Sequence, residues 1–440
     1  MTIDTEPMQT RGRLPRVVYV LAAGTFLMGT TEFMIAGLLP DIADDVHVSE
    51  ARSGLLITAF AIGMIVGSPV MALATRRLPQ RSVLTLALVI FAAGHVVGAL
   101  SSTFIVLLGA RVLTALATGA FWAVAAVVAG DAAGPGARAR AIGVVIGGLT
   151  LANVVGVPIG TWAGQLAGWR GPFWALAVRA LAAAAAIGRL IPATGREAAT
   201  SVRTEVAALR NRNLWLALSA CAFVMGGVLA TYTYISPLLT QHAGIPAGEV
   251  PLVLIGFGLG ALAGTTTGGR LGDRRPIATA LTAAGATAIV LLALTTLSRM
   301  PAAAVVLVFL VALAGFAVNP IATDLSVRFA GPAATLGAAL STSAFNTGIA
   351  AGSWLAGIAL DSSLGPTGPA LVGTVIAAMT LAPLTILALG RATRDPSWIS
   401  GRRSSSSCAR DADRPGRTEA PPVAGLLAVD GGAVTIVAGG

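Results

Sequence analysis

The sequence predicts an all-α integral membrane protein with twelve transmembrane helices in two pseudo-symmetric six-helix bundles. Three observations lead to this prediction: a low charge content, a series of long apolar segments, and a similarity between the two halves. Of the 440 residues, 55% are hydrophobic and 11% are charged, whereas a soluble domain has about 25% charged residues. This composition excludes a soluble globular protein, a disordered chain and a nucleic-acid-binding domain.

Twelve weakly charged segments account for most of the chain, and each can cross a hydrocarbon core of about 30 Å as a helix. Helices are required because lipid offers the backbone no hydrogen-bond partner. The first apolar run exceeds the ~7–15-residue core of a signal peptide, so we expect it to remain as a span. The expected spans are residues 17–39, 53–74, 82–100, 104–129, 141–167, 171–191, 214–239, 250–268, 277–297, 301–323, 334–360 and 364–390.

The charges of the connecting loops predict the orientation. Arginines gather in the loops on one side, and acidic residues such as Asp41, Asp44 and Glu50 lie on the other. Basic loops favour the cytoplasm, so we expect a multi-pass cell-membrane protein with both termini cytoplasmic. The net charge of +10 therefore indicates membrane orientation and not nucleic-acid binding. The expected partners are a small hydrophobic molecule, protons and the lipid bilayer, and the expected state is a monomer.

Matching residues in the two halves indicate a duplication. Transporters with such repeats place the substrate between them, near the midplane. The expected organisation is a cytoplasmic N-terminus (1–16), two bundles (17–191 and 214–390), a cytoplasmic linker (192–213) and a disordered tail (391–440). Two sets of residues recur at equal spacing: Phe60, Gly63 and Gly67 with Phe257, Gly260 and Gly264, and Gly156, Gly160 and Trp162 with Gly348, Gly352 and Trp354.

Glu32 is the one acidic residue, of 19, that lies well inside a span. Placing a carboxylate in the bilayer costs several kcal/mol, so an intramembrane acid is a candidate functional residue. A carboxyl in a low-dielectric site also holds a proton more readily than one in water. We therefore expect Glu32 to couple protons from a central cavity. The alternative is a structural hydrogen bond to a neighbouring helix.

Arg111 lies in the fourth span and requires a polar partner or a water-filled cavity. It can set the protonation of a nearby carboxylate or bind a polar substrate group. The alternative is a side chain that reaches toward the nearby end of its span. Arg179 lies in the middle of the sixth span, where the sequence suggests no partner, and the lone His95 of the third span indicates a structural hydrogen bond more than titration.

The fifth span combines Gly156, Pro158 and Gly160. Small residues four apart permit close helix packing, and a proline bends or interrupts a helix. These residues predict tight packing, which is also compatible with a hinge between the two halves.

Further polar and aromatic residues are candidates for a cavity lining, although lipid-facing rings and interfacial belts explain aromatic residues equally well. The sequence has no phosphate-binding loop, no clustered metal-ligating residues and no nucleophile elbow. Cys221 and Cys408 lie too far apart for a metal motif. We therefore expect no enzyme activity, no metal and no cofactor. The cavity candidates are Phe33, Phe121, Trp122, Asn153, Tyr232, Tyr234 and Asn346.

The chain resembles the 12-span drug:proton antiporters of the major facilitator superfamily over about residues 15–390. The segment 152–164 resembles the fifth-span antiporter motif, with Val157 between the glycine and the proline, and 111–124 resembles the fourth-span motif. The segments 29–43 and 55–79 resemble actinobacterial chloramphenicol-resistance exporters.

The resemblance implies roles for particular residues. It assigns proton coupling to Arg111 and, by placement, to Glu32. It also implies a gating loop after the second span. The first half keeps Arg76 there but has Thr75 in place of the acid, whereas the second-half copy keeps Asp273 and Arg274.

The function implied is proton-coupled efflux of a small hydrophobic antibiotic, with chloramphenicol as the first candidate. An exporter of sugars or other amphipathic metabolites is the alternative, because one fold serves many substrates. A membrane receptor or scaffold gives no reason to keep Glu32 and Arg111 in the bilayer, and a membrane enzyme requires a catalytic cluster that the sequence lacks.

Overall fold

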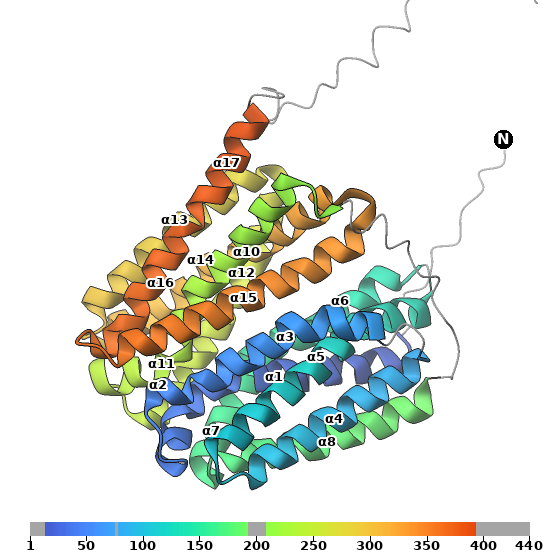
Figure 1. Ribbon diagram of the computed structural model, residues 1–440, viewed down its shortest axis with the longest axis horizontal. Coiled ribbons are helices and arrows are strands. Elements are labelled where there is room, and N and C mark those ends of the chain that lie inside the picture. Colours follow the sequence, from blue (N-terminus) through green and yellow to red (C-terminus); the bar gives the residue numbers. More distant parts are fainter. Residues whose placement is uncertain (1–13, 75–77, 135, 192–207, 393–440) are drawn as a thin grey trace, which may run out of the picture. The chain divides into compact units, whose positions relative to one another are not determined.

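Two groups of long helices make up the structure (Figure 1), a computed structural model that describes residues 14–74, 78–134, 136–191 and 208–392. The first group comprises α1 (Arg16–Asp45), the short α2 (Glu50–Ser53), α3 (Leu55–Ala74), α4 (Gln80–Leu100), α5 (Phe104–Ala133), α6 (Arg138–Leu151), α7 (Val157–Ala167) and α8 (Arg170–Leu190). The second comprises α10 (Arg212–Thr233), the short α11 (Ile235–Pro237), α12 (Val250–Arg274), α13 (Pro276–Leu297), α14 (Pro301–Ala330), α15 (Ala334–Leu360), α16 (Gly368–Met379) and α17 (Leu381–Ala392).

Within the described residues, eleven helical segments are long and apolar enough to cross a membrane. The twelfth expected span, 334–360, forms the 27-residue helix α15, which is not among the eleven. The reason lies in the first half of α15, where Ser341, Thr342, Ser343, Asn346 and Thr347 lower its hydropathy. These polar residues lie on a helix that packs against both α10 and α3, so protein rather than lipid surrounds much of α15.

Several helices extend beyond the expected spans. Helix α5 ends four residues later, at Ala133, α12 six residues later, at Arg274, and α14 seven residues later, at Ala330. Helix α1 continues through Pro40 to Asp45, six residues beyond the expected end, although an interior proline removes one helix hydrogen bond. Helix α17 ends at Ala392, two residues into the expected tail. The rest of that tail, together with residues 192–207 of the expected linker, lies outside the described residues.

The helix of the fifth span is interrupted close to the glycines and proline that the sequence singles out. A π-helical turn (Ala152–Gly156) joins α6 to α7, and Pro158 occupies the first turn of α7. Proline has no backbone N–H, so Pro158 cannot donate to the carbonyl four residues earlier. Gly156 faces Thr30 and Gly160 faces Met34, both on α1, so these glycines bring the fifth span against the first.

The matching glycines of the two halves lie at equivalent close contacts between helices. Gly63 and Gly67 bring α3 against α5, and Gly260 and Gly264 bring α12 against α14. Likewise Gly348 and Gly352 bring α15 against α10, as the fifth-span glycines bring α7 and the π turn against α1. The repeat seen in the sequence therefore corresponds to a repeated set of helix pairs.

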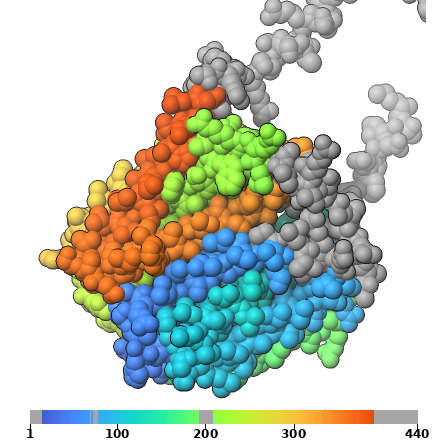
Figure 2. Space-filling model, viewed as in Figure 1, coloured from blue at the N-terminus to red at the C-terminus, as the bar shows by residue number. Residues whose placement is uncertain are grey.

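The two halves meet along two pairs of helices. Helix α3 runs beside α15, and Figure 2 shows the orange atoms of α15 along the blue atoms of α3. On the other pair, α12 packs against the π turn and α7. Gly258 allows this approach, because a Cβ there would lie 2.5 Å from the carbonyl oxygen of Asn153 and 2.7 Å from the Cα of Val154.

Hydrogen bonds join the halves at the end where α2 and α11 lie. The Tyr234 hydroxyl donates to the Ala51 carbonyl at 3.0 Å, and the Gln241 amide donates to the Glu50 carboxylate at 2.9 Å. The Gln165 amide donates to the Ala247 carbonyl at 2.8 Å. These contacts hold this end of the interface together.

Candidate functional site

Glu32 lies in the middle of α1, buried between the two halves. Its side chain is 8% exposed, and its Oε2 atom has no hydrogen-bond partner. A buried carboxyl oxygen without a partner is costly and points to a proton or a ligand as the missing partner. The structure thus places Glu32 inside the protein and leaves one of its oxygens available.

A central pocket surrounds Glu32 and is shared by both halves. Phe33, Phe60 and neighbouring apolar residues of the first half line it, and Tyr232 and Asn346 contribute from the second half. Asn346 donates its amide to the Thr342 carbonyl at 3.0 Å, which leaves its Oδ1 atom buried without a partner. Two residues of the pocket lining, one from each half, therefore carry a buried polar atom without a partner, and most of the other lining residues are apolar.

The free space in the central pocket is small. It measures ≈ 10 Å³, which is about what one water molecule requires. An antibiotic of drug size cannot enter until side chains or whole helices move. The described conformation therefore has its central site closed.

Arg111 is buried to 1% exposure inside the first bundle, so it does not extend toward the end of its span. Its Nη1 donates to the carbonyl and the hydroxyl of Thr31, both at 3.1 Å, and its Nε donates to the Leu56 carbonyl at 3.3 Å. The guanidinium also lies over the ring of Phe60, 4.4 Å from its centre. Arg111 thus holds the residue next to Glu32 and one wall of the pocket.

His95 extends this network to α4. Its Nδ1 lies 2.8 Å from the Phe91 carbonyl, and its Nε2 lies 2.8 Å from the Thr31 hydroxyl. A carbonyl can only accept, so Nδ1 carries the hydrogen. In the neutral ring Nε2 then accepts from Thr31, whose oxygen accepts from Arg111. The chain of donors runs from Arg111 through Thr31 to His95, and no direct bond joins Glu32 to Arg111 in the described structure.

Several expected cavity residues lie away from the central pocket. Phe121 is fully buried against Gly24, and Trp122 packs beside Phe60. Asn153 lies in the π turn against Gly258, and Tyr234 bonds across the halves at the α2–α11 end. The structure therefore brings Glu32, Phe33, Tyr232 and Asn346 together and leaves the other four elsewhere.

The expected gating residues lie at the ends of helices. Asp273 and Arg274 are exposed at the end of α12. Arg76 falls outside the described residues. Arg179, for which the sequence suggested no partner, is exposed on the surface of α8.

Sequence reasoning missed two parts of this site. Phe60 entered only as a marker of the repeat, yet it lines the pocket and lies under Arg111. Thr31 connects Arg111 to His95. Each could have been found from a residue that the sequence already singled out: Thr31 directly precedes Glu32, and Phe60 is the repeat partner of Phe257.

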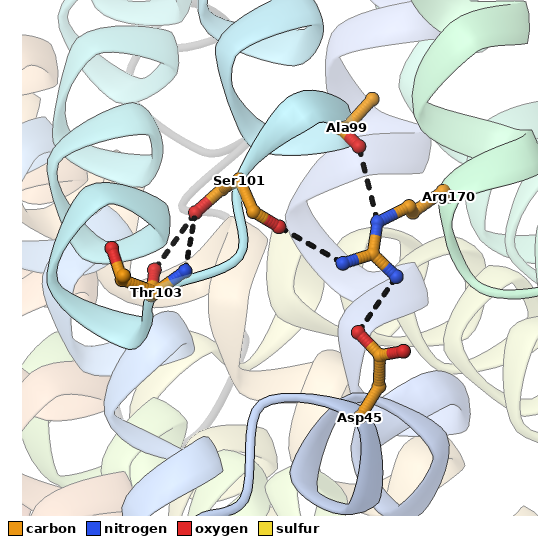
Figure 3. A network of polar contacts seen from close by, with 5 residues as sticks. All are labelled: Asp45, Ala99, Ser101, Thr103 and Arg170. Carbon is orange, nitrogen blue, oxygen red and sulfur yellow. Dashed lines mark hydrogen bonds and ion pairs between the residues drawn. The ribbon is translucent and has the colours of Figure 1, made fainter.

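Arg170 forms a second polar network, at the end of the first bundle (Figure 3). It pairs with Asp45 at 2.6 Å and donates to the carbonyls of Ala99 and Ser101 at 3.1 and 2.9 Å. Ser101 in turn bonds to Thr103. The network ties α1, α4, α5 and α8 together and lies partly exposed, so its place in the fold is structural.

Comparisons with known proteins agree with this architecture. The sequence model of the Major Facilitator Superfamily matches residues 21–342 of this chain. The chain is 39% identical to a chloramphenicol resistance protein of Streptomyces lividans over 84% of this chain and 95% of that one. It is 34% identical to the inner membrane transport protein YdhP of Escherichia coli K12, over 82% and 93%.

A solved structure has the same fold. A bacterial homologue of the human lysosomal transporter Spinster, in an inward-facing and occupied conformation, superposes with a TM-score of 0.67 at 19% identity. The match covers 89% of this chain and 98% of that one. The all-helical membrane fold expected from the sequence is confirmed, and the chain belongs to the Major Facilitator Superfamily of membrane transporters.

Proposed function

We propose that this chain exports a small hydrophobic antibiotic, chloramphenicol first among the candidates, in exchange for protons. The observation that carries the proposal is the unpartnered oxygen of Glu32 in a pocket shared by both halves. The similarity to the Streptomyces protein supplies the substrate class. In this proposal both termini are cytoplasmic, and residues 17–191 and 214–390 move as two bodies joined by the linker 192–213.

Competition at Glu32 couples the two fluxes. The free oxygen of Glu32 either takes a proton or accepts a hydrogen bond from a donor group of the drug. A proton that arrives from the outside therefore favours release of the drug, and by linkage a bound drug favours release of the proton. Arg111, held by Thr31 and Leu56, supplies a fixed positive charge beside this exchange.

Alternation of access follows from the contacts between the halves. The bonds of Tyr234 to Ala51 and of Gln241 to Glu50 hold the α2–α11 end closed. We propose that this end faces outward, since the acidic loops lie there. Release to the outside then requires these bonds to break and the halves to rock about the packed helix pairs.

The test is accumulation of labelled chloramphenicol in cells that express the chain, with and without a protonophore. We expect low accumulation that rises when the proton gradient collapses. Glu32→Gln keeps the shape of the protonated side chain but cannot exchange the proton, so we expect it to lose the gradient-dependent part of export. Asp44→Asn, the same chemical change at an exposed position of α1, is the matched control and should export normally.

Two results contradict the proposal. Export by Glu32→Gln with an unchanged pH dependence would remove Glu32 as the coupling residue. Accumulation equal to that of the empty vector, with the protein present in the membrane, would remove chloramphenicol as the substrate and favour the exporter of sugars or other amphipathic metabolites.

A further inference from the structure

A second pocket lies within the second bundle and shares a wall with the central pocket. We call it the apolar pocket; its lining includes Val228, Ile235, Phe257, Leu294, Val308 and Val311, together with Thr231 and Tyr232. Among the described residues, Tyr232 is the one that lines both pockets. Tyr232 therefore contributes to the wall between them.

The two pockets differ in chemistry. The central pocket contains the free oxygens of Glu32 and Asn346, each on a side chain more than nine-tenths buried. In the apolar pocket the polar side chains are the Tyr232 phenol and Thr231, whose hydroxyl is directed at the Pro369 carbonyl. One pocket thus has unpartnered hydrogen-bond acceptors on residues of its lining, and the other is lined mainly by apolar side chains.

The Tyr232 ring fills the space between them. It lies 4.3 Å from the ring of Phe257, at 35°, and 6.1 Å from that of Phe33 in an edge-to-face contact. Its hydroxyl donates one long hydrogen bond, 3.3 Å, to the Phe33 carbonyl of the other half. Each pocket alone has ≈ 10 Å³ of free space, too little for an aromatic ring.

We propose that the Tyr232 ring occupies, in the described conformation, the subsite for an aryl group of the substrate. When the ring swings aside, the space it vacates has the size and aromatic surroundings that a substituted phenyl group requires, with Phe257 as its stacking partner. The other end of the ligand then places its donors against Glu32 and Asn346. The substrate class is an uncharged molecule with a flat aryl group at one end and hydroxyl or amide donors at the other.

This inference rests on the proposed function for the direction of transport, but it makes its own prediction about binding. If Tyr232 must move, its hydrogen bond to Phe33 opposes the ligand. Tyr232→Phe removes that bond and keeps the ring. Since a hydrogen bond contributes about two- to tenfold in an equilibrium constant, we expect Tyr232→Phe to bind chloramphenicol tighter by roughly that factor. A hydroxyl that contacted the ligand directly would give the opposite sign.

The measurement is calorimetric titration of the purified full chain in detergent. The probes are chloramphenicol and its fragment without the ring, N-(1,3-dihydroxypropan-2-yl)dichloroacetamide. Val311→Phe fills the apolar pocket, so we expect chloramphenicol to bind at least about tenfold more weakly while the fragment is unaffected. Val306→Phe is the matched control, because Val306 lies on the same helix but is 56% exposed. Val308→Leu is a milder filling variant, should Val311→Phe fail to fold.

A second pair of probes separates this inference from the proposed function. Phenyl and methyl β-galactoside differ in the aryl group and share their hydroxyl donors. If the unsubstituted chain ignores chloramphenicol but prefers the phenyl galactoside, and the filling variants remove that preference, the proposed drug is wrong and the aryl subsite stands. If neither aryl probe is preferred to its ring-free partner, or if filling weakens both members of a pair equally or neither, the subsite is overturned.

Discussion

The two halves of the molecule share a scaffold but differ in what they bury. Among the described residues, the buried ionisable side chains of the first half include Glu32, His95 and Arg111, whereas those of the second half are Tyr232, Tyr234 and Cys221, with no carboxylate, imidazole or guanidinium. Both halves contain a run of ring contacts: Phe91, His95, Phe173 and Trp169 in the first half, which includes the imidazole, and Tyr232, Phe257 and Phe316 in the second. In the proposed mechanism, the first half binds the transported proton and the second half contacts the apolar part of the ligand.

The repeat partners Phe60 and Phe257 illustrate this divergence. Each lies three residues before the first of the two glycines that bring its helix close to a neighbouring helix. Phe60 lies under the Arg111 guanidinium, whereas Phe257 stacks on Tyr232. One ring supports a charge and its counterpart supports an aromatic wall, so side-chain chemistry distinguishes the halves at this matched position.

The largest expected effect in a direct test of this comparison comes from Arg111, and Arg179 is its control, because both arginines lie inside spans of the first half. Arg111→Met removes the charge and the hydrogen bonds to Thr31 and Leu56 while filling similar volume, so we expect the fold to persist and proton-coupled export to fall at least about tenfold. Arg179→Met removes an exposed charge on α8 and should leave export unchanged. Initial rates of drug efflux at matched expression measure both. Equal rates for the two variants would contradict a special role for Arg111.

A smaller effect is expected where the halves meet. In Gly258→Ala the new Cβ would lie 2.5 Å from the Asn153 carbonyl oxygen, so α12 must move away from the π turn. We expect efflux to slow by roughly three- to tenfold and the Tm to fall, because overpacking costs about 1–3 kcal/mol. Gly256→Ala, on the same helix with nothing within 4 Å, is the control. A Gly258→Ala protein as active and stable as this control would show that the contact between α12 and the π turn accepts an extra methyl group without cost.

The smallest effect is expected at Arg170. Its ion pair with Asp45 is partly exposed, with side chains 35% and 41% accessible, and exposed pairs contribute about 0–1 kcal/mol. Arg170→Gln should therefore lower the Tm slightly and leave the efflux rate and its dependence on the proton gradient intact. Loss of gradient dependence in this variant would mean that charges of the first half act together over a longer range than the comparison assumes.

The sequence by itself determined the membrane fold and the repeat. Low charge, spans of membrane length and the constraint that lipid places on the backbone leave helices as the solution for a chain like this. The recurring glycines could also be recognised from the sequence, because close helix packing requires small residues at regular spacing. Glu32 was also readable, since a single acid inside a span stands out against its apolar neighbours.

Only the tertiary structure decided which candidates share a pocket. Aromatic residues such as Phe121, Trp122, Tyr232 and Tyr234 look alike in a helical sequence, yet among them only Tyr232 lines the pocket with Glu32. That outcome depends on how each helix is rotated and where the two halves touch. Contacts between residues such as Tyr232 and Phe33, which are 199 positions apart, are set by the packing of whole bundles, and no local pattern records them.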